Sequence, residues 1–181
     1  GKEGRHVRTV EHLLSALKGM GVDNLVIEVD GEEMPAMDGS AWPYVQLIEE
    51  SGIVAQKEAT RSLFEYTRRE SFVCKTGLSS YKILAKEGLS INMSISFPGT
   101  AIGIQEKEFH VNGSYAKEIS RARTFCLESE ISQLRLAGLA KGGSLANTIV
   151  VGTKTTQSDE PLRYKDEFVR HKILDLLGDI S

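Results

Sequence analysis

The sequence predicts an α+β fold of two domains that divide near residue 58. Helical and strand-like patterns occur on both sides of that point. Residues 54–69 are polar and charged and carry little apolar material, which is typical of a linker. We therefore expect a first domain over residues 1–57 and a second over residues 58–181.

The first domain is expected to contain a helix, a strand and a second helix. Apolar residues recur at helical spacing from Val10 to Met20, and Thr9 is available as the N-cap. Residues 24–30 (NLVIEVD) predict a buried strand. An amphipathic helix should follow over residues 43–50, opened by a proline in its first turn. One strand cannot complete a sheet, so we expect an upstream segment to complete this unit.

The second domain should contain short strands and two helices. Turns that contain glycine separate the strand patterns. One helix is expected over residues 128–137, before the glycine-rich segment GLAKGGS, and the last over residues 164–177. The expected strands are residues 70–75, 80–85, 89–96, 107–111 and 145–151.

Composition and charge are those of an ordinary globular protein. The chain has 22 basic and 25 acidic residues, a net charge of -3, which does not favour binding to nucleic acid or to an anionic membrane. No run approaches the roughly eighteen continuous apolar residues of a membrane span. Cys74 and Cys126 are far apart and lack metal-type spacing, so we expect reduced thiols in a cytoplasmic protein.

Three polar residues should share one face of the last helix. His171, Asp175 and Asp179 are spaced four residues apart. An imidazole and a carboxylate at this spacing can bind one divalent ion. A solvated ion pair has the same spacing, and the pattern alone favours that simpler interpretation.

The first helix carries Glu11 directly before His12. Neighbours on a helix point about 100° apart, so the two side chains can flank one site without sharing a ligand atom. This suits a histidine that binds a metal beside a glutamate that acts on the metal's water. A glutamate that stabilises the helix N-terminus, beside a surface histidine, explains the pattern equally well.

Three long segments resemble a known family. They are TVEHLLSALKGMGVDNLVIEVDGEEMPAMDGSAWPYV, ISRARTFCLESEISQLRLAGLAKGGSLANTIVV and LRYKDEFVRHKILDLLGDIS. In this order, and nearly end to end, they are similar to the bacterial UDP-3-O-acyl-N-acetylglucosamine deacetylases; residues 55–118 match much less well. The resemblance implies two layered sandwiches of sheet and helices with the active site between them. It also implies that the first domain is the C-terminal part of the family's domain I, and that the second is truncated at its C-terminus.

The resemblance implies a zinc amidohydrolase that removes the acetyl group from UDP-3-O-acyl-N-acetylglucosamine, the committed step of lipid A biosynthesis. His12, His171 and Asp175 would bind the zinc and leave one position for water. Glu11 would be the general base. Thr124 would donate a hydrogen bond to the oxyanion, although a strand-end hydroxyl bonded to the backbone is the simpler interpretation of that residue alone.

Further roles follow from the same resemblance. Lys172 would lie near polar groups of the substrate, although a solvated lysine fits the pattern equally well. Asp179 would orient a histidine that protonates the leaving amine and that lies beyond Ser181. Phe125 is the best candidate for contact with the sugar or acyl group. An apolar passage for the acyl chain is assigned only collectively, because a core-facing amphipathic helix has the same pattern. Its expected lining is Leu127, Ile131, Leu134, Leu136 and Leu139.

Two alternative functions remain. A hydrolase with a Ser or Cys nucleophile is one, although no GxSxG motif occurs and neither cysteine has a histidine nearby in sequence. A truncated, non-catalytic relative that binds sugar nucleotides is the other. His6 and His110 fit no motif and are expected not to bind metal. We expect a monomer without stable membrane insertion, and weak activity at best from these residues alone.

Overall fold

The structure is a computed structural model that describes residues 6–56, 71–138 and 142–181. Its elements are α1 (Glu11–Met20), α2 (Trp42–Ser51), β1 (Phe72–Thr76), β2 (Ser79–Ile83), β3 (Ser90–Phe97), β4 (Gly103–His110), α3 (Tyr115–Glu118), β5 (Phe125–Leu127), α4 (Ile131–Leu136), β6 (Ile149–Val151), β7 (Thr156–Gln157) and α5 (Glu167–Asp179). A 3-10 turn, Glu128–Glu130, leads into α4. Helices and small sheets are mixed, as expected for an α+β chain. The expected domain boundary, and most of the linker, fall outside the described residues.

The described strands form three small sheets. β1 pairs with β2, and β3 pairs with β4 in an antiparallel register that runs from Ser90 opposite His110 to Phe97 opposite Gly103. β6 lies between β5, which is parallel to it, and β7, which is antiparallel. β4 begins four residues before the predicted strand. The short elements α3, β5 and β7 were not predicted, because segments of two to four residues are too short to show a periodic pattern.

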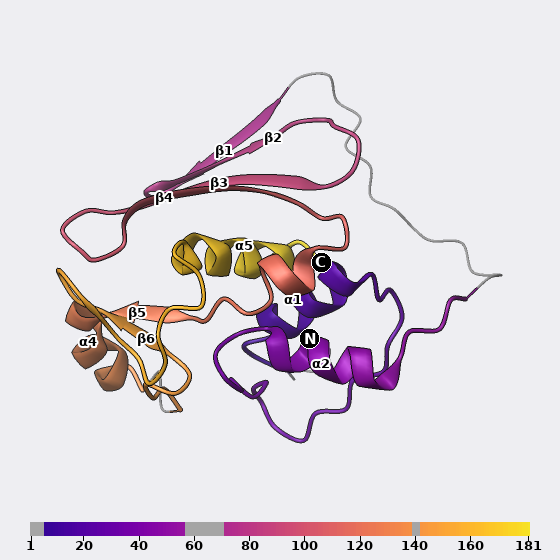
Figure 1. Ribbon diagram of the computed structural model, residues 1–181, viewed down its shortest axis with the longest axis horizontal. Helices are drawn as coiled ribbons and strands as arrows, with labels where there is room; N and C mark the ends of the chain where they lie inside the picture. The colour runs from indigo at the N-terminus through magenta and orange to yellow at the C-terminus, as the bar shows by residue number, and fades with distance from the viewer. Residues whose placement is uncertain (1–5, 57–70, 139–141) are drawn as a thin grey trace.

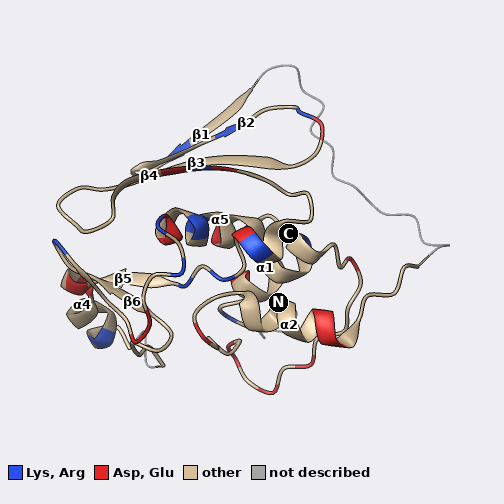
Figure 2. Cartoon of the chain, viewed as in Figure 1, with Lys and Arg blue, Asp and Glu red and all other residues tan. Residues whose placement is uncertain are grey.

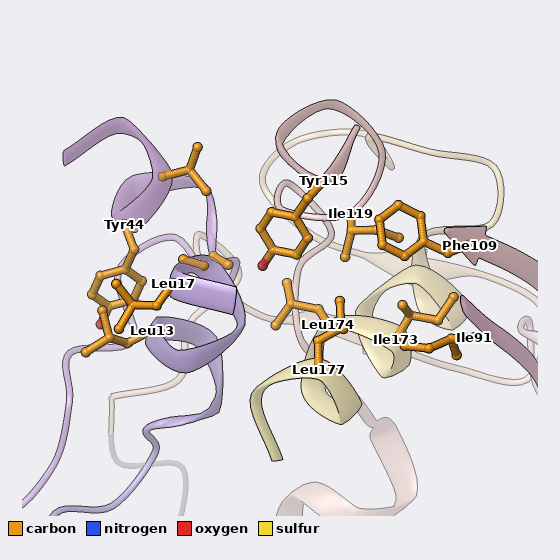
Figure 3. Packing of buried hydrophobic residues seen from close by; sticks show 13 residues of the cluster. Leu13, Leu17, Tyr44, Ile91, Phe109, Tyr115, Ile119, Ile173, Leu174 and Leu177 are labelled. Carbon is orange, nitrogen blue, oxygen red and sulfur yellow. The ribbon is translucent and has the colours of Figure 1, made fainter. Parts of the chain in front are cut away.

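The core lies where α1 packs between α2 and α5 (Figure 1). Its cluster of buried residues joins Leu13 and Leu17 of α1, Tyr44 of α2, and Leu174 and Leu177 of α5 (Figure 3). The β3–β4 hairpin covers another side of α5 and adds apolar side chains to the same cluster. Burying one such side chain stabilises a fold by about 1.5–3 kcal/mol. This packing fixes the distance between the first and last helices.

The buried strand expected over residues 24–30 is absent. Leu25, Val26 and Ile27 are 57%, 85% and 44% exposed. None of these seven residues pairs with another strand in the described parts of the chain. A strand needs a neighbour to satisfy its backbone groups and to cover its apolar face, and the described sheets lie elsewhere. The prediction is therefore wrong for this structure.

The start of α1 also differs from the prediction. Val10 occupies the N-cap position, and no side chain caps the helix. Thr9 has a positive φ of 57°, and its hydroxyl donates a hydrogen bond of 2.6 Å to the Glu33 carboxylate. Thr9 therefore ties the entry of α1 to a distant loop. The helix ends at Gly21, whose φ of 73° few other residues adopt readily.

The charged residues are spread over several elements, and both signs occur along α5 (Figure 2). None of the helices in the described residues is long and apolar enough to cross a membrane.

Candidate metal centre

The first and last helices bring together three side chains that can bind a metal. His12 comes from α1, and His171 and Asp175 come from α5. One donor atom from each lies within 4.8 Å of the other two. The convergence expected from the sequence is therefore found, between residues near opposite ends of the chain.

One carboxylate oxygen faces both histidines. Oδ1 of Asp175 lies 3.3 Å from Nε2 of His171 and 3.7 Å from Nε2 of His12. His171 and Asp175 share a helix face because they are four residues apart. The two imidazole rings meet edge to face, with their centroids 5.1 Å apart. Two imidazole nitrogens and one carboxylate oxygen, each able to bind a metal, therefore lie close together.

A backbone carbonyl fixes the orientation of His171. Its Nδ1 lies 3.0 Å from the carbonyl oxygen of Ala122, and a carbonyl can only accept. In the neutral imidazole Nδ1 therefore carries the hydrogen, and Nε2 presents a lone pair towards Asp175. A lone pair and a carboxylate oxygen repel each other unless a cation lies between them. This is the orientation that a metal-bound histidine needs.

Burial keeps both imidazoles neutral. It lowers the pKa of His171 to about 4, against the opposing effect of Asp175, and it also lowers the pKa of His12. Burial alone would raise the pKa of the Asp175 carboxyl. The nearby His171, Lys172 and His12 outweigh this effect and lower that pKa. Neutral imidazoles with an ionised carboxylate are the protonation states in which these groups bind zinc. The three residues therefore fit a zinc ion.

Lys172 and Phe125 lie beside this cluster. The Lys172 ammonium donates a hydrogen bond of 3.0 Å to Oδ2 of Asp175, so the other carboxylate oxygen faces the histidines. The same ammonium lies 5.3 Å from the centre of the Phe125 ring. That ring packs edge-on against His171, at 6.3 Å, and Phe168, at 5.0 Å. Lys172 and Phe125, two of the predicted substrate-binding residues, therefore border the ligands.

The remaining predicted catalytic residues occupy three different positions. Glu11 is the half-buried first residue of α1, close enough to His12 and Tyr44 to influence the pKa of each. Thr124 precedes β5, and its backbone is held on both sides: its N–H donates to the Gly39 carbonyl and its carbonyl accepts from the Ile149 N–H. Asp179 is exposed at the end of α5.

A buried ion pair next to the site was not expected from the sequence. Arg123 is 1% exposed and Glu167 is 0% exposed. The backbone N–H and the Nε of Arg123 both donate to Oε1 of Glu167 at 3.0 Å. Glu167 lies one turn before His171, and Arg123 lies between Ala122 and Thr124. The pair therefore fastens the segment that enters β5 to α5.

Of the residues expected to line an acyl passage, Leu127 lies on β5, and Ile131, Leu134 and Leu136 lie on α4. Ile131 and Leu134 are half-buried and Leu136 is exposed, whereas Leu139 falls outside the described residues. Leu134 lines a surface pocket of about 390 Å³ beside α4. A second pocket, of about 440 Å³, is lined by none of the predicted site residues. The passage remains a prediction.

Two further histidines lie outside the ligand cluster. His6 is exposed near the start of the described residues. His110 is exposed at the end of β4 and lies 3.4 Å from a carboxylate oxygen of Glu108. Neither contributes to the group of donor atoms on α1 and α5.

The fold and the site define a mixed α and β protein with a possible metal centre of two histidines and one aspartate. Three protein ligands of this kind are typical of catalytic rather than structural zinc sites. The sequence model of the LpxC family, UDP-3-O-acyl N-acetylglycosamine deacetylase, matches residues 2–181, and the chain belongs to this family.

The chain is similar to curated proteins named UDP-3-O-acyl-N-acetylglucosamine deacetylase. The protein from Saccharophagus degradans is 43% identical over 182 residues, which cover 99% of this chain and 59% of that protein. The protein from Nautilia profundicola is 45% identical, with coverage of 100% and 61%. The one from Myxococcus xanthus is 43% identical, with coverage of 100% and 57%. The chain therefore spans about 60% of the length of these relatives.

Proposed function

We propose that this protein is a zinc-dependent amidohydrolase that removes the acetyl group from UDP-3-O-acyl-N-acetylglucosamine, the committed step of lipid A biosynthesis. The convergence of the buried His12 and His171 with the half-buried Asp175 carries this proposal. The family and the names of its relatives supply the substrate. The expectations of a cytoplasmic location and a monomer stay predictions.

The zinc would be held by Nε2 of His12, Nε2 of His171 and Oδ1 of Asp175. A zinc ion with three protein ligands keeps one position for water, lowers the pKa of that water to about 7 and polarises a carbonyl. The Ala122 carbonyl supports this assignment, because it keeps the hydrogen of neutral His171 on Nδ1. Lys172 supports it too, because its ammonium engages the other oxygen of Asp175.

Glu11 and Thr124 would act on the reacting groups. Glu11 takes a proton from the attacking water while the water oxygen bonds to the acetamide carbon. The Thr124 hydroxyl donates a hydrogen bond to the carbonyl oxygen as it gains negative charge. The C–N bond then breaks, acetate leaves, and the amine takes up a proton. The family resemblance assigns that proton to a histidine oriented by Asp179.

Other side chains would bind the rest of the substrate. Lys172 and the ring of Phe125 border the ligand cluster, where the sugar would approach. The acyl chain would pass along β5 and α4, with Ile131 and Leu139 among its contacts. We also propose that the site lies between two layered domains. In support, α1 belongs to residues 1–57, whereas α5 belongs to residues 58–181.

Acetate release under single-turnover conditions tests the proposal. With the protein in excess over UDP-3-O-acyl-N-acetylglucosamine, even slow hydrolysis yields detectable acetate. We expect release in the presence of zinc, loss of release after chelation, and recovery when zinc is restored. His171→Ala should abolish release, and His110→Ala, which changes an exposed histidine, should leave it unchanged.

The same experiment separates the two alternatives. Equal acetate release from chelated and zinc-loaded protein would contradict the proposal and favour a Ser or Cys nucleophile. Binding of the substrate without acetate release at any zinc concentration would instead indicate a non-catalytic relative that binds sugar nucleotides.

A further inference from the structure

The helices α1 and α5 come unusually close where Gly178 faces Glu11. A Cβ atom placed on Gly178 would lie 2.1 Å from the carbonyl oxygen of Glu11, 2.7 Å from its carbonyl carbon and 2.8 Å from its Cα. Real Cβ atoms essentially never approach other atoms within 3.0 Å. All three opposing atoms belong to the backbone, so no side-chain rotation can relieve the contact.

The conformation of α5 does not explain this glycine. Gly178 is buried in the last turn of the helix and is not among the residues with positive φ, so any L-residue could adopt its backbone angles. Glycine is less favourable than alanine inside a helix. The methyl group of an alanine at position 178 would occupy the space that the first turn of α1 fills.

We propose that Gly178 is a positioning residue of the metal centre. Its missing side chain lets the first turn of α1 approach α5, so that His12 reaches His171 and Asp175. The contact lies next to the ligands on both helices, because Glu11 directly precedes His12 and Asp175 lies three residues before Gly178. This inference rests on the proposed zinc site.

The size of the clash decides which ligand is affected. The Glu11 carbonyl oxygen would have to move from 2.1 Å to at least 3.0 Å, a shift of about 0.9 Å. Metal sites hold their ligand distances to within about 0.2 Å. His171 and Asp175 lie on the same helix as Gly178 and keep their mutual spacing. A side chain at position 178 should therefore remove His12 alone from the set of ligands.

A double-mutant cycle in zinc affinity tests this inference. Zinc alone is the probe, and its dissociation constant is measured by competition with a chromophoric chelator for wild type, Gly178→Ala, His12→Ala and the double variant. Gly178→Ala should weaken zinc binding by about 10–100-fold, the usual effect of losing a residue that orients a ligand. In the His12→Ala background the same change should alter affinity by less than about twofold.

Two glycines provide matched controls. Gly142→Ala adds a methyl group that meets nothing within 4 Å and should leave zinc affinity unchanged. Gly19→Ala places a Cβ against the ring of Tyr115, on α1 but seven residues beyond His12, and so disturbs the packing of the same helix. Its zinc affinity should remain near that of wild type as long as the protein is folded by circular dichroism.

The outcomes separate this inference from the zinc site itself. If His12→Ala leaves zinc affinity unchanged, His12 is not a ligand and the proposed site fails. If His12→Ala weakens binding but Gly178→Ala does not, or if the two effects multiply, the role of Gly178 is wrong. A Gly178→Ala protein that stays unfolded in saturating zinc also overturns the inference, because the contact would then serve the whole fold.

Discussion

Nε2 of His12 lies 3.7 Å from Oδ1 of Asp175, although the two residues come from the first and last helices of the structure. The same oxygen lies 3.3 Å from Nε2 of His171. Because the Ala122 carbonyl holds the hydrogen of neutral His171 on Nδ1, the Nε2 lone pair of His171 faces this carboxylate oxygen. A cation between the two atoms removes their mutual repulsion, which gives the cluster a physical reason to bind metal.

Replacing Glu11 by glutamine should separate catalysis from metal binding. In an active deacetylase that carries this sequence, Glu11→Gln should lower turnover by about 10²–10⁴-fold, the usual contribution of a positioned acid–base group. Zinc content, measured by atomic absorption, should stay the same. Loss of zinc in this variant would make Glu11 a ligand or a support of the ligands. Glu49→Gln, at an exposed position on α2, is the matched control.

The metal-free protein should lose stability in mild acid because His171 is buried. Burial lowers the pKa of His171 to about 4, so between about pH 6.5 and 4 the unfolded chain binds a proton that the folded chain does not. The unfolding free energy should be constant above that window and fall within it as pH decreases. The loss should be on the order of 3 kcal/mol.

Several neighbours influence this profile. His12 on α1 also has a lowered pKa and adds to the slope, while Asp175 opposes the shift and Lys172 contributes to it. Urea unfolding at a series of pH values, with a chelator present, provides the measurement. His171→Gln should flatten the profile, whereas His110→Gln, at an exposed position, should not. An unchanged slope in His171→Gln would contradict the assignment.

Gly19→Ala should destabilise the protein. In an exposed helix this change stabilises by up to about 1 kcal/mol. Here the added Cβ would lie 2.2 Å from the buried ring of Tyr115, whose hydroxyl donates a hydrogen bond to Ser15. Overpacking of this kind costs about 1–3 kcal/mol, which urea unfolding can measure. A stabilised variant would show that α1 and α3 are not in this close contact.

Removing one member of the buried ion pair should be more costly than removing both. Arg123→Met leaves the Glu167 carboxylate buried without its guanidinium and should cost about 3–5 kcal/mol. Adding Glu167→Leu should recover part of this loss, although the backbone N–H groups of residues 123 and 163 then lose their acceptor. Additive effects in the double-mutant cycle would contradict a direct pair. Chemical denaturation of the four proteins gives the comparison.

The ligand-bearing helices could be predicted from the sequence alone. Apolar residues at helical spacing define both, and His171 and Asp175 share a face whatever the fold. The convergence of these residues with His12 followed from the family resemblance rather than from spacing, because no local pattern relates the first helix to the last. The prediction of a buried strand over residues 24–30 failed because a short apolar run does not reveal whether a neighbouring strand exists.

Other parts of the site leave no trace in the sequence. The Ala122 carbonyl orients His171, but every residue has a carbonyl, so this contact depends only on tertiary structure. The role proposed for Gly178 becomes visible only in the structure, where the backbone of Glu11 lies against it. The pairing of Arg123 with Glu167 likewise joins two positions that no motif relates.

X-ray absorption at the zinc edge tests the central claim most directly, because it counts the ligands around the ion. We expect one zinc per chain, bound by two imidazole nitrogens and by oxygen at about 2.0–2.2 Å. His12→Ala and His171→Ala should each remove one imidazole from the spectrum. A zinc site with fewer than two imidazoles in the wild type, or spectra unchanged by both substitutions, would contradict the account.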